Sequence, residues 1–366
     1  MDRSIKDIFH FLGVSLLVFL AAAALNFAVD PLQILRPAWL FAAMYSQDTR
    51  LQNAGLIKSQ DFDTVFMGTS LAIHFRQSDI DRVVGVKSLK LAMTGSSSRE
   101  QTFVLAAALA RQPRRVIWEV DDWIFHDTPD IDANTHLPAD LYRGNARGIA
   151  GYLLSGAMAR EAAWIMARSI PQLEPFIARL TSEALFKFPL SRVDDINALR
   201  PDEDAIFNAK RTMAAFSYIS DPLRSQYLKD DTDYDMKVRV FERDAIGLIS
   251  ANPDVTFDIY LPPYSVLQWV ALRDTSPETL KSVYAFSAYF CRRLMDFPNV
   301  RLFDFRAVSE VTHDLNNYSD VIHHSPAIDL QVLSWLAQGK YRVGAPAPTA
   351  YLDQLKAQVE VYRLTN

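Results

Sequence analysis

The feature that most constrains this chain is a long apolar segment close to its N-terminus. Residues 11–25 (FLGVSLLVFLAAAAL) contain no charged or strongly polar side chain, and the apolar stretch extends over residues 9–29. A helix over that stretch would be roughly 31 Å long at about 1.5 Å per residue, close to the thickness of the hydrocarbon core of a bilayer. Asp30-Pro31 follows, and proline disfavours helical geometry in the residue before it. The segment therefore predicts one transmembrane helix that ends near residue 29.

The basic residues around this segment predict its orientation. Arg3 and Lys6 precede it, whereas the first basic residue after it is Arg36. This asymmetry favours a cytoplasmic N-terminus, so we expect a single-pass inner-membrane protein whose body lies on the periplasmic side. Two alternatives stay open: a cleaved signal peptide, for which residues 21–24 (AAAA) offer small residues to a peptidase, and a buried N-terminal core helix.

The rest of the chain has the composition of a folded protein. Hydrophobic residues make up 49% and charged residues 22% of the 366 positions, which excludes a largely disordered chain. The net charge of −5 argues against a nucleic-acid partner. Cys291 is the only cysteine, which excludes an internal disulfide and every cysteine-based zinc or redox motif. We expect no cofactor and no metal.

Five short runs rich in β-branched and aromatic residues, each followed by a break, predict β-strands. Helical patterns lie between most of them, which predicts a parallel five-stranded sheet with helices on both faces, a three-layer α/β/α fold. The predicted strands are residues 62–67, 88–93, 115–120, 255–261 and 300–305, and the predicted helices are residues 100–111, 235–250 and 277–294. Ligands of such sheets bind beyond the carboxyl ends of the strands, so the chemistry is expected there.

Residues 126–240 interrupt this alternation. They carry Ala- and Met-rich helical patterns and no clear strand pattern, which predicts a helical insertion. The insertion would either cover the site or form a helical layer without contact to it. The predicted organisation is therefore a membrane anchor, a connector, two halves of an α/β domain separated by the insertion, and a peripheral tail: residues 1–30, 31–60, 61–125, 126–240, 241–340 and 341–366.

Two distant segments carry candidate catalytic residues. Ser70 follows the first predicted strand in the sequence Gly-Thr-Ser, in a turn that opens a helix, where a serine hydroxyl is exposed at the catalytic end of a sheet. Asp320 and His323 are three residues apart, so the carboxylate can orient the imidazole, and the imidazole can deprotonate a serine. The simpler explanations are a serine N-cap and a solvated loop. A metal site built from Asp320, His323, His313 and His324 would lack a carboxylate cluster on the strands.

A glycine after the second predicted strand is a further candidate. Gly95 follows Thr94 at the end of that run, and a glycine lets a backbone N–H approach a substrate oxygen closely. An ordinary glycine that ends a strand is the alternative explanation.

In combination, these three features resemble the SGNH (GDSL-like) hydrolase superfamily. Neighbouring features are similar to its membrane-anchored branch of envelope acyl-transfer proteins, which includes relatives of the alginate O-acetylation proteins AlgJ and AlgX and, more distantly, the teichoic-acid D-alanylation protein DltD. The features are the N-terminal segment that ends in Asp-Pro and the sequences FDTVFMGTSLA, LPPYS and NYSDVIHHSP. The resemblance covers roughly residues 10–125 and 240–340, and it does not cover the helical insertion.

The resemblance implies a role for each candidate residue. Ser70 would be the nucleophile, His323 the general base and Asp320 its orienter, and the backbone N–H groups of Ser70 and Gly95 would form the oxyanion hole. The superfamily usually has an Asn after the third strand, where this chain has two aspartates. An ionised aspartate cannot donate a hydrogen bond, so Asp122 could contribute to the oxyanion hole only if it were protonated.

The resemblance also implies acyl-ester chemistry outside the cytoplasm. The serine would take an acyl group, in particular acetyl, and pass it to a hydroxyl of a cell-envelope or exported polysaccharide, or to water. An MBOAT-type membrane protein is the implied acyl-carrying partner. The missing Asn favours an alternative of another class, a catalytically silent membrane-tethered scaffold or carbohydrate-binding subunit, and a simple esterase is a third. Four aromatic residues near the predicted strand ends could stack on a sugar ring or could be core: Trp118, Trp123, Tyr264 and Trp269.

Overall fold

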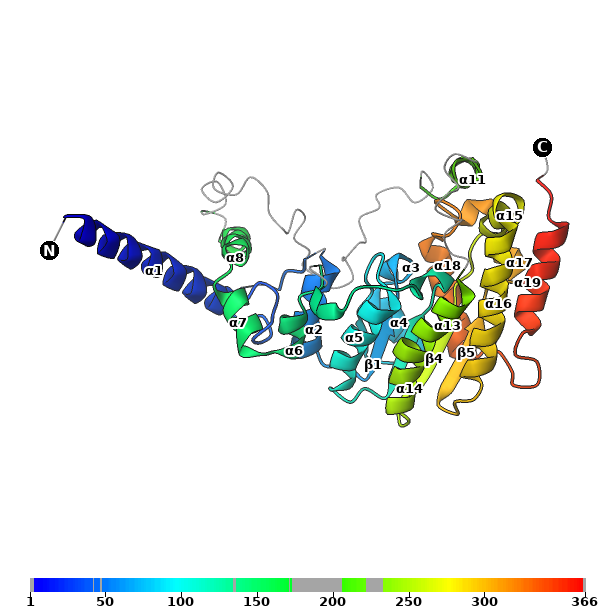
Figure 1. The fold of residues 1–366 in the computed structure, drawn as a ribbon, viewed down its shortest axis with the longest axis horizontal. Helices are drawn as coiled ribbons and strands as arrows, with labels where there is room; N and C mark the ends of the chain where they lie inside the picture. The colour runs from blue at the N-terminus through cyan, green and yellow to red at the C-terminus, as the bar shows by residue number, and fades with distance from the viewer. Residues whose placement is uncertain are drawn as a thin grey trace. The chain divides into compact units, whose positions relative to one another are not determined.

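The computed structural model describes residues 3–41, 43–46, 48–133, 136–170, 172, 206–221 and 233–364. The chain divides into two compact units (Figure 1). One unit combines Met1–Asp61 with Ile131–Ile196, and the other combines Phe62–Asp130 with Asn197–Asn366.

The described part of the first unit is helical. Its longest element is the N-terminal helix α1, and shorter helices follow it in the chain. Their bounds are α1 Arg3–Val29, α2 Thr49–Ser59, the short 3₁₀ turn η2 Ile131–Ala133, α6 Ala139–Arg143, α7 Ala146–Leu153 and α8 Gly156–Ser169.

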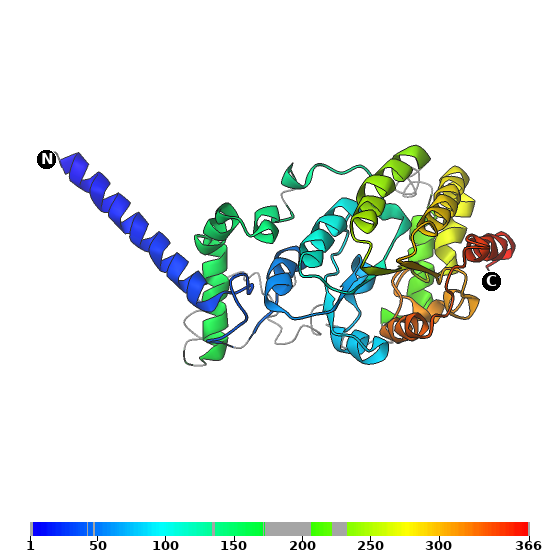
Figure 2. The ribbon, with the colours of Figure 1, turned by 90° about the horizontal axis from the view of Figure 1, so that it is seen from below.

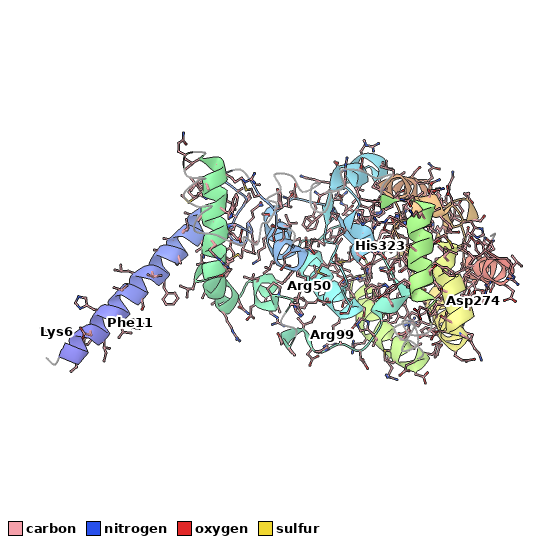
Figure 3. All side chains as sticks on the ribbon, turned by 90° about the horizontal axis from the view of Figure 1, so that it is seen from above. Lys6, Phe11, Arg50, Arg99, Asp274 and His323 are labelled. Carbon is pink, nitrogen blue, oxygen red and sulfur yellow. The ribbon has the colours of Figure 1, made fainter. Side chains whose placement is uncertain are left out.

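Helix α1 is long enough and apolar enough to cross a membrane. The candidate span covers Ile5–Val29 with a mean hydropathy of 2.4, and none of its most apolar window is buried inside the protein. Phe11, for example, is 71% exposed and projects away from the helix (Figure 3). This exposure does not fit the alternative of a buried core helix, whose apolar side chains would pack against other elements.

The helix ends at Val29, as the Asp-Pro sequence predicts. Asp30 leaves the helical conformation with φ +50°, and its carboxylate accepts hydrogen bonds from the backbone N–H groups of Ile34, Leu35 and Arg36 at 2.8–3.0 Å. The last turns of α1 pack against α7 and α8. There the buried Asn26 donates to the carbonyls of Leu153 and Ser155, at 2.8 and 3.0 Å, and so satisfies backbone groups at the end of α7.

The second unit is built on a five-stranded parallel sheet, as predicted. Its strand order is β2-β1-β3-β4-β5, and every neighbouring pair is parallel. Almost every strand residue is buried, because helices cover both faces of the sheet. The strands lie inside the predicted runs: β1 Thr64–Met67, β2 Ser88–Lys90, β3 Arg115–Glu119, β4 Thr256–Leu261 and β5 Val300–Asp304.

The sheet is the middle of three layers (Figure 2). Side chains on one face, including Phe66, Ile117 and Tyr260, form a core with α4 and α18. On the other face lie α5, the helical segment from α13 to α14, and α16. The bounds of the helices are α3 Ser70–Ile73, α4 Gln77–Val84, α5 Ser98–Leu109, α11 Ala209–Ile219, α13 Tyr234–Phe241, α14 Gly247–Ala251, α15 Val266–Thr275, α16 Pro277–Leu294, α17 Ser309–Thr312, α18 Pro326–Gln338 and α19 Ala350–Val361.

The predicted insertion and tail contain helices that differ in their surroundings. In the described part of residues 126–240, helices α6 to α8 group with the first unit, whereas α11 and α13 group with the sheet. Most of residues 171–205 and all of 222–232 lie outside the described residues, so the single-insertion model stays a prediction. The tail is not peripheral: its helix α19 buries Leu352, Leu355 and Val359 in a cluster with Trp269 and Leu280.

Candidate active site

The site begins at the carboxyl end of β1, next to the point where the sheet changes direction. From β1 the chain crosses to β2 on one side and then to β3 on the other, and open α/β sheets bind ligands at such a switch point. Gly68 and Thr69 leave β1, and the half-buried Ser70 is the first residue of the short helix α3. As an N-terminal helical residue, Ser70 has a backbone N–H without an intrahelical acceptor.

His323 reaches this turn from the loop before α18 (Figure 3). Its Nε2 lies 2.9 Å from Ser70 Oγ, and its Nδ1 lies 2.6 Å from Asp320 Oδ2. The second oxygen of Asp320 accepts the backbone N–H groups of Ile322 and His323, both at 2.8 Å, which fixes the carboxylate within its own turn. With Nδ1–H donating to Asp320, Nε2 is the acceptor for the Ser70 hydroxyl. The sequence predicted this convergence, and the structure brings all three side chains together.

Electrostatics keep the carboxylate ionised. Burial acts to raise the pKa of Asp320, but the hydrogen bonds and the charge of His323 outweigh burial, and the net pKa is lowered. An ionised Asp320 is what a neutral imidazole with its proton on Nδ1 requires, and it also stabilises the imidazolium that forms when His323 accepts a proton.

The other two histidines considered for a metal site lie elsewhere. His324 is buried, with Nδ1 2.9 Å from Asp329, so it does not compete with His323 for the serine. The ring of His313 packs edge-on against Tyr362. Within the described ranges, no group of three or more His, Cys, Asp or Glu side chains is arranged to hold a metal ion.

The two predicted oxyanion-hole positions beyond Ser70 have different surroundings. Gly95 is exposed in a turn with φ +63°, and the hydrogen bond from Met93 N–H to Gly68 O (2.9 Å) holds this turn beside the one that carries Ser70. Asp122 lies 3.3 Å from Arg306 and accepts the Ser287 hydroxyl at 3.3 Å. This ion pair favours the ionised carboxylate and argues against Asp122 as a donor. The role of Gly95 stays a prediction.

Sequence reasoning missed two buried carboxyl groups under the Ser70 turn. Glu119 is the last residue of β3, and Asp121 follows two residues later; both contact Thr69, and Tyr264 donates a hydrogen bond to Asp121. Glu119 could have been suspected, because a carboxylate at the end of an otherwise apolar strand must have polar partners.

A pocket of about 780 Å³ adjoins the three side chains on the Asp320 side. It lies between α11, the start of α15, the loop of residues 319–322 and the segments that follow β3 and β4. Of the four aromatic residues noted in the sequence, Trp123 and Tyr264 line it, whereas Trp118 and Trp269 are core. Its other polar or aromatic lining residues are Arg211, Tyr218, Gln268, Ser319 and Asp320.

Comparison with known proteins adds no relative to this description. No family model matches the chain, and no curated protein matches its sequence.

Proposed function

We propose that the chain is a membrane-anchored, extracytoplasmic serine O-acyltransferase or esterase of the SGNH type. The observation that carries the proposal is the continuous hydrogen-bonded series from Ser70 through His323 to Asp320. A serine nucleophile needs an adjacent base that is itself oriented by a third group, and these residues meet both conditions.

The chemistry follows from the protons that these atoms can hold. As Ser70 Oγ bonds to the acyl carbonyl carbon of a donor ester, its proton passes to His323 Nε2. The tetrahedral intermediate then expels the alcohol of the donor, which takes that proton and leaves an acyl-serine. In the second half, His323 accepts a proton from an incoming hydroxyl as its oxygen attacks the acyl carbon, and it returns the proton to Ser70 when the acyl–serine bond breaks.

The oxyanion would be held by backbone N–H groups. The Ser70 N–H and the Gly95 N–H are the two donors in the proposal, since Asp122 is engaged by Arg306. Two backbone donors without the side-chain donor usual in the superfamily would make the site slower, because one donor contributes roughly 10²–10³-fold to the rate in related chemistry.

The pocket gives a place for the acceptor. In a transferase, another hydroxyl must outcompete water at the acyl-serine, which requires a bound acceptor and exclusion of solvent. The aromatic faces of Trp123 and Tyr218 beside the amide of Gln268 suit a sugar ring, which has apolar C–H faces and hydroxyl groups at its edges. We therefore favour a cell-envelope or exported polysaccharide as acceptor, with an acetyl group transferred.

The anchor would hold this chemistry at a membrane surface. In the proposal, α1 spans the inner membrane with its N-terminus in the cytoplasm, and the α/β body works on the periplasmic side. Work beside a membrane suits an acyl donor supplied by a membrane-bound partner of the MBOAT type.

The decisive experiment is covalent labelling of the purified chain by a serine-directed fluorophosphonate. We expect one adduct on Ser70, no adduct in Ser70→Ala, and slow labelling in His323→Ala. Ser309→Ala is a matched control, because Ser309 is also the first residue of a four-residue helix, α17, and it is exposed. His136→Ala, an exposed histidine of the other unit, is the control for His323→Ala.

The absence of labelling would favour the second candidate, a catalytically silent scaffold or carbohydrate-binding subunit. The observation that supports this alternative is the engagement of Asp122, which leaves the oxyanion position after β3 without a side-chain donor. A scaffold would still bind an oligosaccharide in the pocket, so binding without labelling identifies it. Labelling with release of free acetate only, whatever sugar is present, would identify a simple esterase.

A further inference from the structure

Two carboxyl groups are buried directly under the turn that presents Ser70. The side chains of Glu119 and Asp121 are almost completely inaccessible, with 0% and 1% exposure. The backbone crosses Glu119 so closely that a Cβ atom at position 68 would lie 2.5 Å from Glu119 Oε2 and 2.8 Å from Glu119 Cβ. Gly68 is therefore required by the close approach of β1 to this carboxyl group.

Thr69 ties the turn to both carboxyl groups. Its backbone N–H donates to Glu119 Oε2 at 2.8 Å, and its hydroxyl lies 2.5 Å from Asp121 Oδ2 and 3.2 Å from Glu119 Oε2. Tyr264 donates its hydroxyl proton to the other oxygen of Asp121. Thr69 is the N-cap residue of α3, yet its side chain makes no capping hydrogen bond. The hydroxyl of Thr69 is thus used to hold the turn from below.

The donors around this pair are too few for two carboxylates. Three protons, from the Thr69 N–H, the Thr69 hydroxyl and the Tyr264 hydroxyl, face four carboxyl oxygens, and Glu119 Oε1 has no hydrogen-bond partner among the described residues. No ion pair joins either carboxyl group to a basic side chain in the described part of the chain, where the buried Arg306 pairs with Asp122 and Asp304. Two adjacent, buried negative charges without a cation are costly, so one proton belongs between them.

The remaining titratable neighbours do not change this balance. Tyr260 from β4 is buried beside Glu119, and beyond it Asp329 of α18 is paired with His324. Asp122, which follows Asp121, adds a further negative charge. Burial, followed by the charge of Asp121, raises the pKa of Glu119 well above its usual value. Burial also raises the pKa of Asp121, although the hydrogen bonds from Thr69 and Tyr264 oppose the rise, so Glu119 is the member that keeps the proton.

We propose that Glu119 and Asp121 are positioning residues that hold one proton between them and, through Thr69, fix the turn that places Ser70 within reach of His323. The inference rests on the proposed function, in which Ser70 is the nucleophile. Loss of the shared proton would leave two charges under the turn, and their repulsion would displace Thr69 and with it the adjacent Ser70. A misplacement of about 1 Å can cost about 10²-fold in the rate of a positioned reaction.

The pH profile of Ser70 labelling tests the shared proton. In the full chain in detergent, the fluorophosphonate labelling rate should fall at alkaline pH as the pair loses its proton. In Glu119→Gln the carboxamide cannot ionise, its oxygen can still accept the Thr69 N–H, and its amino group can donate to Asp121. We expect this variant to keep at least a third of the neutral-pH rate and to lose the alkaline fall. An unchanged alkaline fall in Glu119→Gln would overturn the inference.

Removal of the Thr69 hydroxyl tests the positioning. Thr69→Val keeps the backbone N–H but loses the hydroxyl, and we expect labelling to slow about tenfold or more at every pH. The matched control is Thr102→Val in α5, where the hydroxyl of a buried threonine donates only within its own helix, to Ser98 O and Arg99 O. Wild-type labelling in folded Thr69→Val, judged by thermal unfolding, would contradict the positioning role and leave the proposed function standing.

Two spectroscopic measurements test the inference even if Ser70 is not labelled at all, an outcome that would sink the proposed function alone. Infrared spectroscopy at neutral pH should show the stretching band of a protonated carboxyl group in the wild type, and Glu119→Gln should lack it. The NMR signals of the His323 imidazole should shift in Thr69→Val and not in Thr102→Val. A spectrum without that band, or unshifted His323 signals, would overturn the inference.

Discussion

Ser70 and His323 stand 253 residues apart in the sequence, and their side chains meet at 2.9 Å. The serine follows the first strand of the sheet, and the histidine lies in the loop before α18, after the last strand. The contact therefore depends on the correct pairing of the strands between them, and changes at either end of it should be measurable in the reactivity of the serine.

The substitution Asp320→Asn should slow the labelling of Ser70 by about 10²–10⁴-fold, because an amide can hold the imidazole in the wrong tautomer and cannot stabilise its charged form. The lowered pKa of Asp320 means that its stabilising interaction with His323 is complete above the pKa of the unfolded chain and is lost only as the pH falls through the folded value. Wild-type labelling should therefore show no loss from Asp320 protonation at neutral or mildly acidic pH.

The control for that change is Asp314→Asn, which alters an exposed aspartate of the same segment that caps a short 3₁₀ turn. Labelling of this variant should stay within about twofold of the wild type. Equal rates for Asp320→Asn and the wild type would remove Asp320 from the proposed mechanism.

Protein stability should fall as the pH rises, because of Glu119. A carboxyl group whose folded pKa is raised contributes fully below the pKa of the unfolded chain, and its contribution is lost progressively up to the folded pKa. In that window the slope is at most about 1.4 kcal/mol per pH unit for one proton. The difference in melting temperature between Glu119→Gln and the wild type should therefore grow with pH, whereas the exposed Glu360→Gln should follow the wild type. Parallel curves for all three proteins would show that Glu119 does not retain its proton.

The pocket predicts a split between transfer and hydrolysis. Trp123→Ala removes an aromatic face from the pocket, and we expect acetyl transfer from an activated ester to an oligosaccharide to fall about tenfold, as for the loss of one stacked aromatic contact of roughly 1.4 kcal/mol. Release of free acetate should fall far less, because water needs no such contact. Tyr351→Ala, at a half-buried tyrosine of α19 outside the pocket lining, is the control. An equal loss of transfer and hydrolysis in Trp123→Ala would argue against an acceptor in this pocket.

The anchor predicts where the chain is found and which side the body occupies. A reporter that is active only after export should be active when fused after residue 366, and the fusion should stay in the membrane fraction after alkaline extraction. Deletion of residues 1–30 should abolish the activity of the reporter. The mass of the membrane-bound chain separates an uncleaved anchor from a signal peptide, since cleavage would remove the apolar helix and release the body.

Much of the fold could be predicted because its signals are local. Each strand is a short apolar run followed by a break, and α16 has the predicted bounds of Pro277–Leu294, with proline at its first turn and Arg292 and Arg293 in its last. The end of α1 was equally readable from Asp30-Pro31. Periodicity could not show that α13 and α14 are joined by a π-helical turn over Glu242–Ile246, since the alternative hydrogen bonding changes the register by a single residue.

The candidate site was readable only in part. Ser70 and the Asp320–His323 pair carry recognisable spacing, and the parallel sheet made their meeting a reasonable expectation. The contacts of Glu119, Asp121 and Asp122 depend on which side chains approach from other strands, and spacing along one segment carries no such information. Arg306, for example, lies after β5 and still pairs with Asp122 after β3. The packing of α19 against α15 and α16 is likewise a tertiary effect that its short polar sequence does not announce.

The parallel order of the strands also sets a sequence of events in time. A ribosome completes Ser70 long before it reaches the codons for β5 and for the loop that carries His323. Until that loop has formed beside the sheet, the serine has only the reactivity of an ordinary alcohol, because its base is still unmade or unfolded. Any encounter with an acyl donor before the last sixty or so residues have folded would therefore be unproductive. Assembly of the fold thus acts as the safeguard on the timing of the chemistry.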